Sequence, residues 1–219
     1  MNFMLEKMGE FFDSRLEGYE EHQLNCIEGA KEFYPFTASL LPRGKDIHIL
    51  DLGCGTGLEL DYYFKALPSA KVTGIDLAPG MLASLREKLS DKDIILIQGS
   101  YFDVPLGERC YDAAVSVESL HHFTKNEKVT LYCKLNKALK PGGYFILTDY
   151  FAPSEAEEIL YRNELDRLKE EQGITDSEFY HYDTPLTVEH ETEALKEAGF
   201  SEVDLIRCWE NTYTLKAQK

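Results

Sequence analysis

The chain has 219 residues, of which 43% are apolar and 28% are charged, a balance typical of one folded domain rather than of a disordered chain. Acidic residues outnumber basic ones by 39 to 23, which gives a formal net charge of −16. This charge argues against broad contact with nucleic-acid phosphates or with anionic lipid, because both need a basic surface.

The five cysteines are scattered along the chain, and no two of them form a Cys-x-x-Cys pair. Such a set is typical of reduced thiols in the cytoplasm rather than of disulfides or a zinc site. Glu6, Lys7 and Glu10 interrupt the first apolar residues, and no later apolar run is long enough to cross a bilayer. We therefore expect a cytoplasmic protein with no signal peptide and no membrane partner.

The residues before the first predicted strand carry two apolar stripes at helical spacing, which predict two helices. Pro35 falls inside the second stripe, where it should break or kink a helix. The two stripes consist of Leu5, Met8, Phe12 and Leu16, and of Leu24, Ile27, Tyr34 and Leu41.

The centre of the chain alternates short apolar runs with segments of helical periodicity, as in a parallel sheet covered by helices. The run Ile94–Ile97 is apolar without alternation, which is expected of a strand buried on both faces. Pro141-Gly142-Gly143 should end one helix and lead into the next strand. The predicted strands are Ile47–Leu52, Lys71–Ile75, Ile94–Gln98, Asp112–Val117 and Tyr144–Thr148.

The pattern changes after the fifth predicted strand. A charged helix is predicted from Ser154 to about Gln172, and the aromatic stretch Phe179–Tyr182 follows it. A short helix should end just before Gly199, which suits the residue after a helix. The tail predicts a last pair of strands, Val203–Trp209 and Thr212–Lys216.

A glycine-rich loop, Asp51-Leu52-Gly53-Cys54-Gly55-Thr56-Gly57, follows the first strand and opens a helix. Glycines let a ligand approach the backbone, and the helix N-terminus offers free N–H groups. The dinucleotide fingerprint G-x-G-x-x-G would need a glycine where Leu58 stands. An acidic residue at the end of the strand suits a ligand with an ammonium group better than a pyrophosphate.

This loop resembles motif I of the class I S-adenosylmethionine (SAM)-dependent methyltransferases. Asp76 ends the second strand, where the family's acidic residue accepts the ribose hydroxyls, and Met81 stands where a methionine often lines the adenine pocket. Ser100 replaces the Asp that many relatives use for the adenine amine. The segments Val115–Phe123 and Leu139–Gly143 are also similar to family motifs, in the same order.

The resemblance implies a SAM site in the crevice at the carboxyl ends of the strands, with S-adenosylhomocysteine as product. In related methyltransferases a tyrosine of an N-terminal helix contacts the methionine part of SAM, and Tyr19 is the candidate here. The residues expected to bind SAM are Tyr19, Asp51, Gly53, Cys54, Gly55, Asp76, Leu77, Met81, Ser100, Tyr101 and Val117.

The implied fold is α/β and Rossmann-like, with a seven-stranded, mostly parallel sheet and helices on both faces. Residues 1–44 would form an N-terminal helical lid and residues 45–150 the SAM-binding core. Residues 151–190 would form a cap inserted after strand five, and residues 191–219 the last helix and an antiparallel strand pair.

The implied activity is transfer of a methyl group from SAM to a small-molecule acceptor by in-line displacement, which positioning alone can accelerate strongly. His122 is a candidate general base, and a hydrogen-bonded pocket wall is its alternative role. His121 and His122 are adjacent, so they cannot share a helical face as i, i+4 metal ligands do, and we expect no metal site. The N-terminal helix is available for a homodimer.

Two alternatives keep the fold. The first is a carboxy-SAM synthase or another tRNA-modifying enzyme, to which the glycine loop and Gly18-Tyr19 are also similar; those synthases hold a carboxylate with an arginine that Phe179–Tyr182 lacks. Direct methylation of tRNA is disfavoured by the negative charge. The second alternative is a SAM-binding module without catalysis, in which decay of the loop or of Asp76 would be expected, and neither has decayed.

Overall fold

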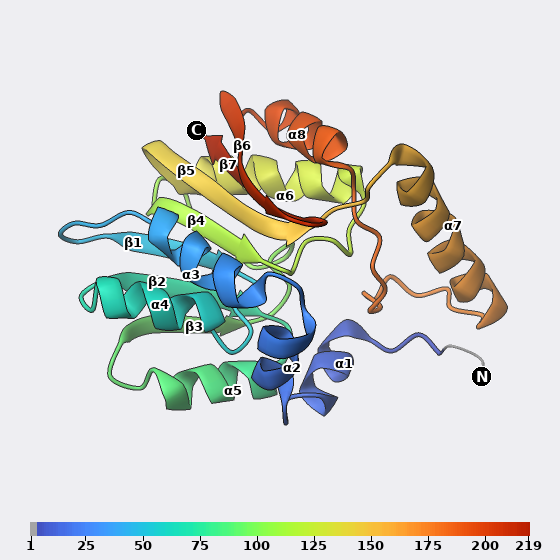
Figure 1. Ribbon diagram of the computed structural model, residues 1–219, viewed down its shortest axis with the longest axis horizontal. Coiled ribbons are helices and arrows are strands. Elements are labelled where there is room, and N and C mark those ends of the chain that lie inside the picture. The colour runs from blue at the N-terminus through green and yellow to red at the C-terminus, as the bar shows by residue number, and fades with distance from the viewer. Residues whose placement is uncertain (1–3) are drawn as a thin grey trace.

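Seven strands form one sheet in the order β3-β2-β1-β4-β5-β7-β6 (Figure 1). The computed structural model describes residues 4–219. Strands β1 to β5 pair in parallel, whereas β7 is antiparallel to both β5 and β6. This confirms the predicted mostly parallel α/β sheet. The strands are β1 (His48–Leu52), β2 (Lys71–Asp76), β3 (Asp93–Gln98), β4 (Tyr111–Val117), β5 (Leu139–Tyr150), β6 (Glu202–Trp209) and β7 (Thr212–Gln218).

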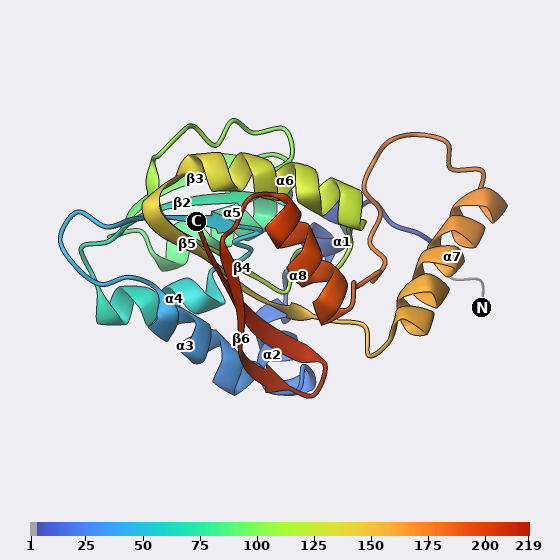
Figure 2. The same cartoon turned by 90° about the horizontal axis from the view of Figure 1, so that it is seen from above.

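Helices cover both faces of the sheet, as Figure 2 shows from above. Apolar side chains of α3, α4 and α5 bury one face, and those of α6 and α8 bury the other. The first helices, α1 and α2, lie at one edge of the molecule, and α7 projects away from the sheet (Figure 1). The helices are α1 (Met8–Ser14), α2 (Tyr19–Cys26), α3 (Ala30–Leu40), α4 (Leu58–Ala66), α5 (Pro79–Lys88), α6 (Lys125–Ala138), α7 (Glu155–Glu171) and α8 (Val188–Glu197).

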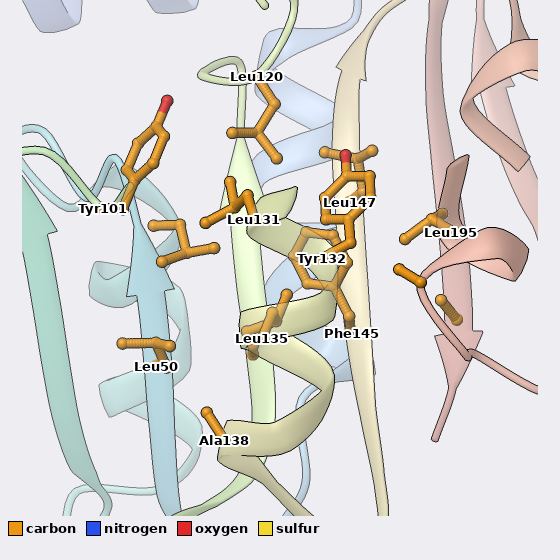
Figure 3. Close-up of a cluster of buried hydrophobic side chains, with 14 of the residues drawn as sticks. Leu50, Tyr101, Leu120, Leu131, Tyr132, Leu135, Ala138, Phe145, Leu147 and Leu195 are labelled. Atoms are coloured by element: carbon orange, nitrogen blue, oxygen red, sulfur yellow. The ribbon is translucent and has the colours of Figure 1, made fainter. Parts of the chain in front are cut away.

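Helix α6 illustrates how the sequence produces a packed layer. Thr124 and Glu127 form a reciprocal capping box that fixes its first turn. Its buried residues recur at helical spacing and pack against β5 and α8 (Figure 3). Each large apolar side chain buried here stabilises the fold by about 1.5–3 kcal/mol. The cluster in Figure 3 includes Leu131, Tyr132, Leu135, Ala138, Phe145, Leu147 and Leu195.

The N-terminal part differs from the prediction of two helices, because the described residues form three before β1. Gly29 separates α2 from α3 with a left-handed φ of 77°, and a Cβ atom there would lie 2.6 Å from the Cβ atom of Trp209. Pro35 does not break α3, which continues from residue 30 to residue 40. The N–H that Pro35 lacks would have bonded to the carbonyl of Lys31, an exposed residue, so the loss is tolerated.

The segment after β5 meets the N-terminus. Leu165 and Leu168 of α7 pack against Leu5, and Lys7 forms an isolated antiparallel bridge with Tyr180. The N–H of Met8 donates to the carbonyl of Phe179 at 2.9 Å. Both chain segments therefore lie over the same end of the sheet. Within residues 4–219, none of the helices combines the length and the apolar character that crossing a membrane would require.

Candidate functional site

The glycine loop between β1 and α4 has a backbone conformation that favours glycine at three positions. Gly53, Gly55 and Gly57 all have left-handed φ values, of 75°, 47° and 73°. A Cβ atom on Gly53 would lie 1.9 Å from Oγ of Ser119, so no larger residue fits there. The N–H groups of residues 53 and 54 donate to the carbonyl of Ile75, which ties the loop to β2.

Asp76 stands at the end of β2 beside this loop. Its Oδ2 atom accepts from the N–H of Gly55 at 2.8 Å, and its Oδ1 atom accepts from the N–H of Ala78 at 2.9 Å. Burial raises the pKa of Asp76, while these backbone donors oppose the rise. Each carboxylate oxygen retains capacity for a further donor, so the pair of oxygens can accept two neighbouring hydroxyl groups.

Asp51, near the end of β1, is a buried carboxyl group beside a second buried carboxyl group, that of Glu59. Its side chain belongs to a residue only 1% exposed, and neither oxygen has a hydrogen-bond donor among residues 4–219. Burial and the charge of Glu59 raise the pKa of Asp51 well above its ordinary value, and burial also raises the pKa of Glu59. Two buried carboxyl groups beside a glycine loop suit a ligand that brings an ammonium group.

A narrow cavity of about 50 Å³ lies at the carboxyl ends of β1, β2 and β4. Among the residues predicted to bind SAM, Asp51 and Cys54 lie beneath its lining, and Oγ of Ser100 accepts from the N–H of Phe102 at 3.2 Å instead of facing the cavity. Eight of the eleven predicted residues line it: Tyr19, Gly53, Gly55, Asp76, Leu77, Met81, Tyr101 and Val117.

Five further residues line the narrow cavity, and His122, the predicted general base, is one of them. Glu118 and Ser119 follow β4 directly, so their place at the sheet edge was available from the strand pattern. Met8 and Phe12 come from α1, where the sequence predicted only the apolar stripe of a helix. Their role in the cavity depends on how α1 folds over the sheet, which no local pattern encodes.

A second, much larger cavity of about 860 Å³ adjoins the first. The two cavities share four lining residues, so a ligand that begins in one can continue into the other. N-terminal helices, the turn between β6 and β7 and the segment around Asp183 enclose the larger cavity. The shared residues are Phe12, Tyr19, Glu118 and His122.

Two histidines follow β4 at the junction of the cavities. Nδ1 of His121 lies 2.6 Å from Oδ1 of Asp149, and Nδ1 of His122 lies 3.1 Å from the carbonyl oxygen of Tyr182. Burial disfavours a charge on both rings, but the charge of Asp149 outweighs it and raises the pKa of His121. Burial and the charge of His121 lower the pKa of His122 to about 3. His122 is therefore a neutral ring.

Glu118 lies between these histidines and the first residue of β7, Thr212. It adopts a left-handed φ of 49°, an uncommon conformation for a residue other than glycine. Burial and the charge of Asp149 raise the pKa of Glu118 to about 8, and Oγ1 of Thr212 donates to its Oε1 atom at 3.3 Å. A carboxyl group that holds its proton near neutral pH can donate a hydrogen bond to a ligand.

The N-terminal helices close over this site through polar contacts. Oδ1 of Asp13 accepts from the N–H of Gly80 at 2.8 Å and so caps α5 from a distance, because the residue at its own N-cap, Ala78, offers no capping side chain. Lys88 of α5 pairs with Glu20 of α2 at 2.7 Å.

The strand order, the glycine loop and the acidic residues at the ends of β1 and β2 together define a class I, SAM-dependent methyltransferase fold. Residues 49–143 of the chain match the family described as the methyltransferase domain.

Two curated relatives and one solved structure illustrate the similarity. An uncharacterized methyltransferase of Geobacillus sp. (strain WCH70) is 29% identical over 147 residues, which cover 67% of this chain and 65% of the relative. A malonyl-[acyl-carrier protein] O-methyltransferase of Priestia megaterium (strain DSM 319 / IMG 1521) is 33% identical over 106 residues, 48% of this chain and 38% of the relative. The chain thus spans less than two thirds of each.

The solved structure is that of Haemonchus contortus phosphoethanolamine N-methyltransferase 2 in complex with SAM. It matches with a TM-score of 0.71 at 16% identity, over 97% of this chain and 58% of that one. Identity at this level shows a shared fold.

Proposed function

We propose that this protein transfers the methyl group of SAM to a small-molecule acceptor. The observation that carries the proposal is the pair of acidic side chains on neighbouring strands, Asp51 and Asp76, on either side of the glycine loop. One is buried without a donor, and the other keeps acceptor capacity. This is the arrangement that an amino acid joined to a ribose requires.

The residues at the narrow cavity fit SAM part by part. The Asp76 carboxylate suits the two ribose hydroxyls, and Leu77 and Met81 offer apolar walls for a base. The Asp51 carboxyl group lies beneath the lining and favours an ammonium group above it. When bound, SAM supplies a methyl group on a positively charged sulfur, and aromatic rings such as those of Tyr19 and Phe12 tolerate such a cation. The chain's own task is to position and enclose the reactants.

The large cavity is the proposed acceptor site. In this proposal the described part of the lid, residues 4–44, and the cap of residues 151–190 enclose the acceptor, while residues 1–3 of the predicted lid lie outside the described residues. His122, which lines both cavities, stands between donor and acceptor. Its low pKa supports the role of a hydrogen-bonding wall more than that of a general base. A homodimer through the N-terminal helix and a cytoplasmic location stay predictions.

Carboxy-SAM synthesis is the alternative that needs testing, and one contact weighs against it. Arg15 is the one arginine that lines the large cavity among the described residues, and both its terminal nitrogens already bond to Glu6, at 3.2 and 2.7 Å. The cavity therefore offers no uncommitted guanidinium for the extra carboxylate. Direct methylation of tRNA is disfavoured by the net charge of −16.

Mass spectrometry tests the proposal in two arms. The nucleoside that copurifies with the protein should be SAM or S-adenosylhomocysteine, and carboxy-SAM would replace our proposal by the alternative. Purified protein incubated with SAM and a library of metabolites should then consume SAM with one acceptor or an acceptor class. Tight binding of SAM without transfer to any acceptor, including bulk tRNA, would instead favour a non-catalytic module.

A further inference from the structure

We propose that His121, His122 and Asp183 form a binding site for one divalent transition-metal ion in the large cavity. The two histidines come from the turn after β4, and Asp183 comes from the segment between α7 and α8. Oδ1 of Asp183 lies 3.4 Å from Nε2 of His121 and 3.4 Å from Nδ1 of His122. All three residues line the large cavity.

These separations fit a shared ion better than they fit direct hydrogen bonds, which are shorter. A tetrahedral ion with bonds of about 2.0–2.1 Å to nitrogen and oxygen holds its ligand atoms about 3.3–3.4 Å apart. Two imidazoles and one carboxylate are also a ligand set that suits Zn²⁺, Co²⁺ or Fe²⁺ more than Mg²⁺ or Ca²⁺. Geometry and donor type therefore agree.

Asp149 orients the His121 ring for such a site by a hydrogen bond to its other nitrogen. Its Oδ1 atom accepts from Nδ1 of His121 at 2.6 Å, so Nε2, which faces Asp183, is the nitrogen that an ion would bind in exchange for its proton. Asp149 itself is a poor ligand, since its oxygens already accept from the N–H groups of Leu120 and Tyr150 as well. The ion is thus expected on the cavity side of His121.

His122 must change its tautomer to join the site. Without an ion, its Nδ1–H group donates to the carbonyl oxygen of Tyr182 at 3.1 Å. On ion binding, the ring proton would move to Nε2 and the Nδ1 lone pair would take the ion. No net proton is released by this ring.

The expectation of no metal site assumed that the histidines lie on a helix. Residues 118–124 form a turn instead, and the rings of His121 and His122 lie with their centroids 4.0 Å apart. Adjacent residues in a turn can therefore present nitrogen atoms to one point. The helical spacing argument does not apply to them.

The site would keep coordination positions for a ligand from the cavity. Asp183 has a side chain that is 52% exposed, whereas those of His121 and His122 are 10% and 2% exposed, so the ion would sit at the cavity wall with one side open. We infer that an acceptor binds there through an oxygen, nitrogen or sulfur atom whose pKa the ion lowers. This role rests on the proposed function, but ion binding itself does not.

Cobalt titration tests the site directly. Untagged, chelator-treated protein is titrated with Co²⁺ while visible absorption is followed, and with Zn²⁺ by calorimetry. We expect one equivalent of either ion to bind. Asp183→Asn, a change at a half-exposed residue, should weaken binding by about tenfold or more, and His122→Gln should do the same. Thermal unfolding of each variant reports whether it is folded.

His190→Ala is the matched control, because His190 also pairs with a carboxylate, Glu158, at 2.9 Å outside the cavity. It should leave the affinity unchanged. The site is overturned if wild-type protein binds neither ion, or if folded Asp183→Asn and His122→Gln bind it as tightly as wild type. Titration of the wild-type protein with SAM in parallel separates the metal site from the proposed function. Wild-type protein that binds the ion but not SAM would overturn only the proposed function.

Discussion

Asp149 accepts a hydrogen bond from Nδ1 of His121 at 2.6 Å, and the pair joins the ends of the neighbouring parallel strands β4 and β5. Asp149 is only 1% exposed and also accepts from the N–H groups of Leu120 and Tyr150. One buried carboxylate therefore organises the whole turn that carries the histidines.

Asp149→Ala should lower the free energy of unfolding by about 3–5 kcal/mol, because it leaves a buried imidazole and a buried N–H group without their acceptor. Urea unfolding at neutral pH measures the change. Asp91→Ala removes an exposed carboxylate paired with Lys92 and should leave the midpoint unchanged. Equal effects of the two substitutions would argue against an organising role for Asp149.

Gly53→Ala should destabilise the protein far more than Gly142→Ala does. Both glycines have left-handed φ values, 75° and 78°, which cost an alanine about 1–2 kcal/mol. Only Gly53 adds a clash, since its new Cβ atom would lie 1.9 Å from Oγ of Ser119 and nothing lies within 4 Å at Gly142. The free energy of unfolding and the affinity for SAM are measured on both variants. Equal values for Gly53→Ala and Gly142→Ala would show that the loop has space for a Cβ atom at Gly53.

Asp51→Asn should stabilise the protein at alkaline pH. Burial raises the pKa of Asp51 in the folded state, so the folded protein binds more protons than the unfolded chain above the ordinary carboxyl range. The contribution of Asp51 to stability is therefore present at low pH and lost as pH rises through the folded-state value.

Thermal unfolding across pH measures this effect. The advantage of Asp51→Asn over wild type should be clear at about pH 8 and small at about pH 4. Asp91→Asn, a change at an exposed residue, should show no such trend. A constant difference between Asp51→Asn and wild type at every pH would contradict the raised pKa.

Asp13→Ala should loosen the lid with a modest loss of stability of about 1 kcal/mol, because it removes the side chain that caps α5. Hydrogen exchange should increase across residues 8–14 and at the start of α5. Glu10→Ala, on the exposed side of the same helix, is the control. Unchanged protection in Asp13→Ala would mean that apolar packing alone holds α1 in place.

Much of the fold follows from sequence pattern. Four of the five central strands were predicted to within one residue at either end, because each is a short, mainly apolar run. The expectation that Ile94–Ile97 is buried on both faces was wrong, because β3 is an edge strand of the sheet and Ile95 is 56% exposed. The fifth, β5, begins earlier than predicted, because Leu139 already pairs with Tyr111 of β4 and the Pro141–Gly143 segment then forms an irregularity within the strand. The third N-terminal helix was missed because the break between α2 and α3, from Ile27 to Gly29, falls inside what the sequence presents as one apolar stripe.

The candidate site was predictable where it depends on the strand ends and not where it depends on the lid. Asp51, Asp76 and Val117 all end strands, so the parallel sheet alone brings them together. The contacts of His122 with Tyr182 and Asp183 join segments about sixty residues apart, and no periodicity reports them. The shape of the large cavity could not be predicted for the same reason, because segments far apart in the sequence enclose it.

Calorimetric titration with SAM tests the assignment of the crevice most directly. We expect wild-type protein to bind one equivalent of SAM, Asp76→Ala to bind it more than tenfold more weakly through loss of the ribose contacts, and the Asp91→Ala control to match wild type. Binding of SAM to folded Asp76→Ala with wild-type affinity, or no binding to wild-type protein, would contradict a SAM site at the ends of β1 and β2.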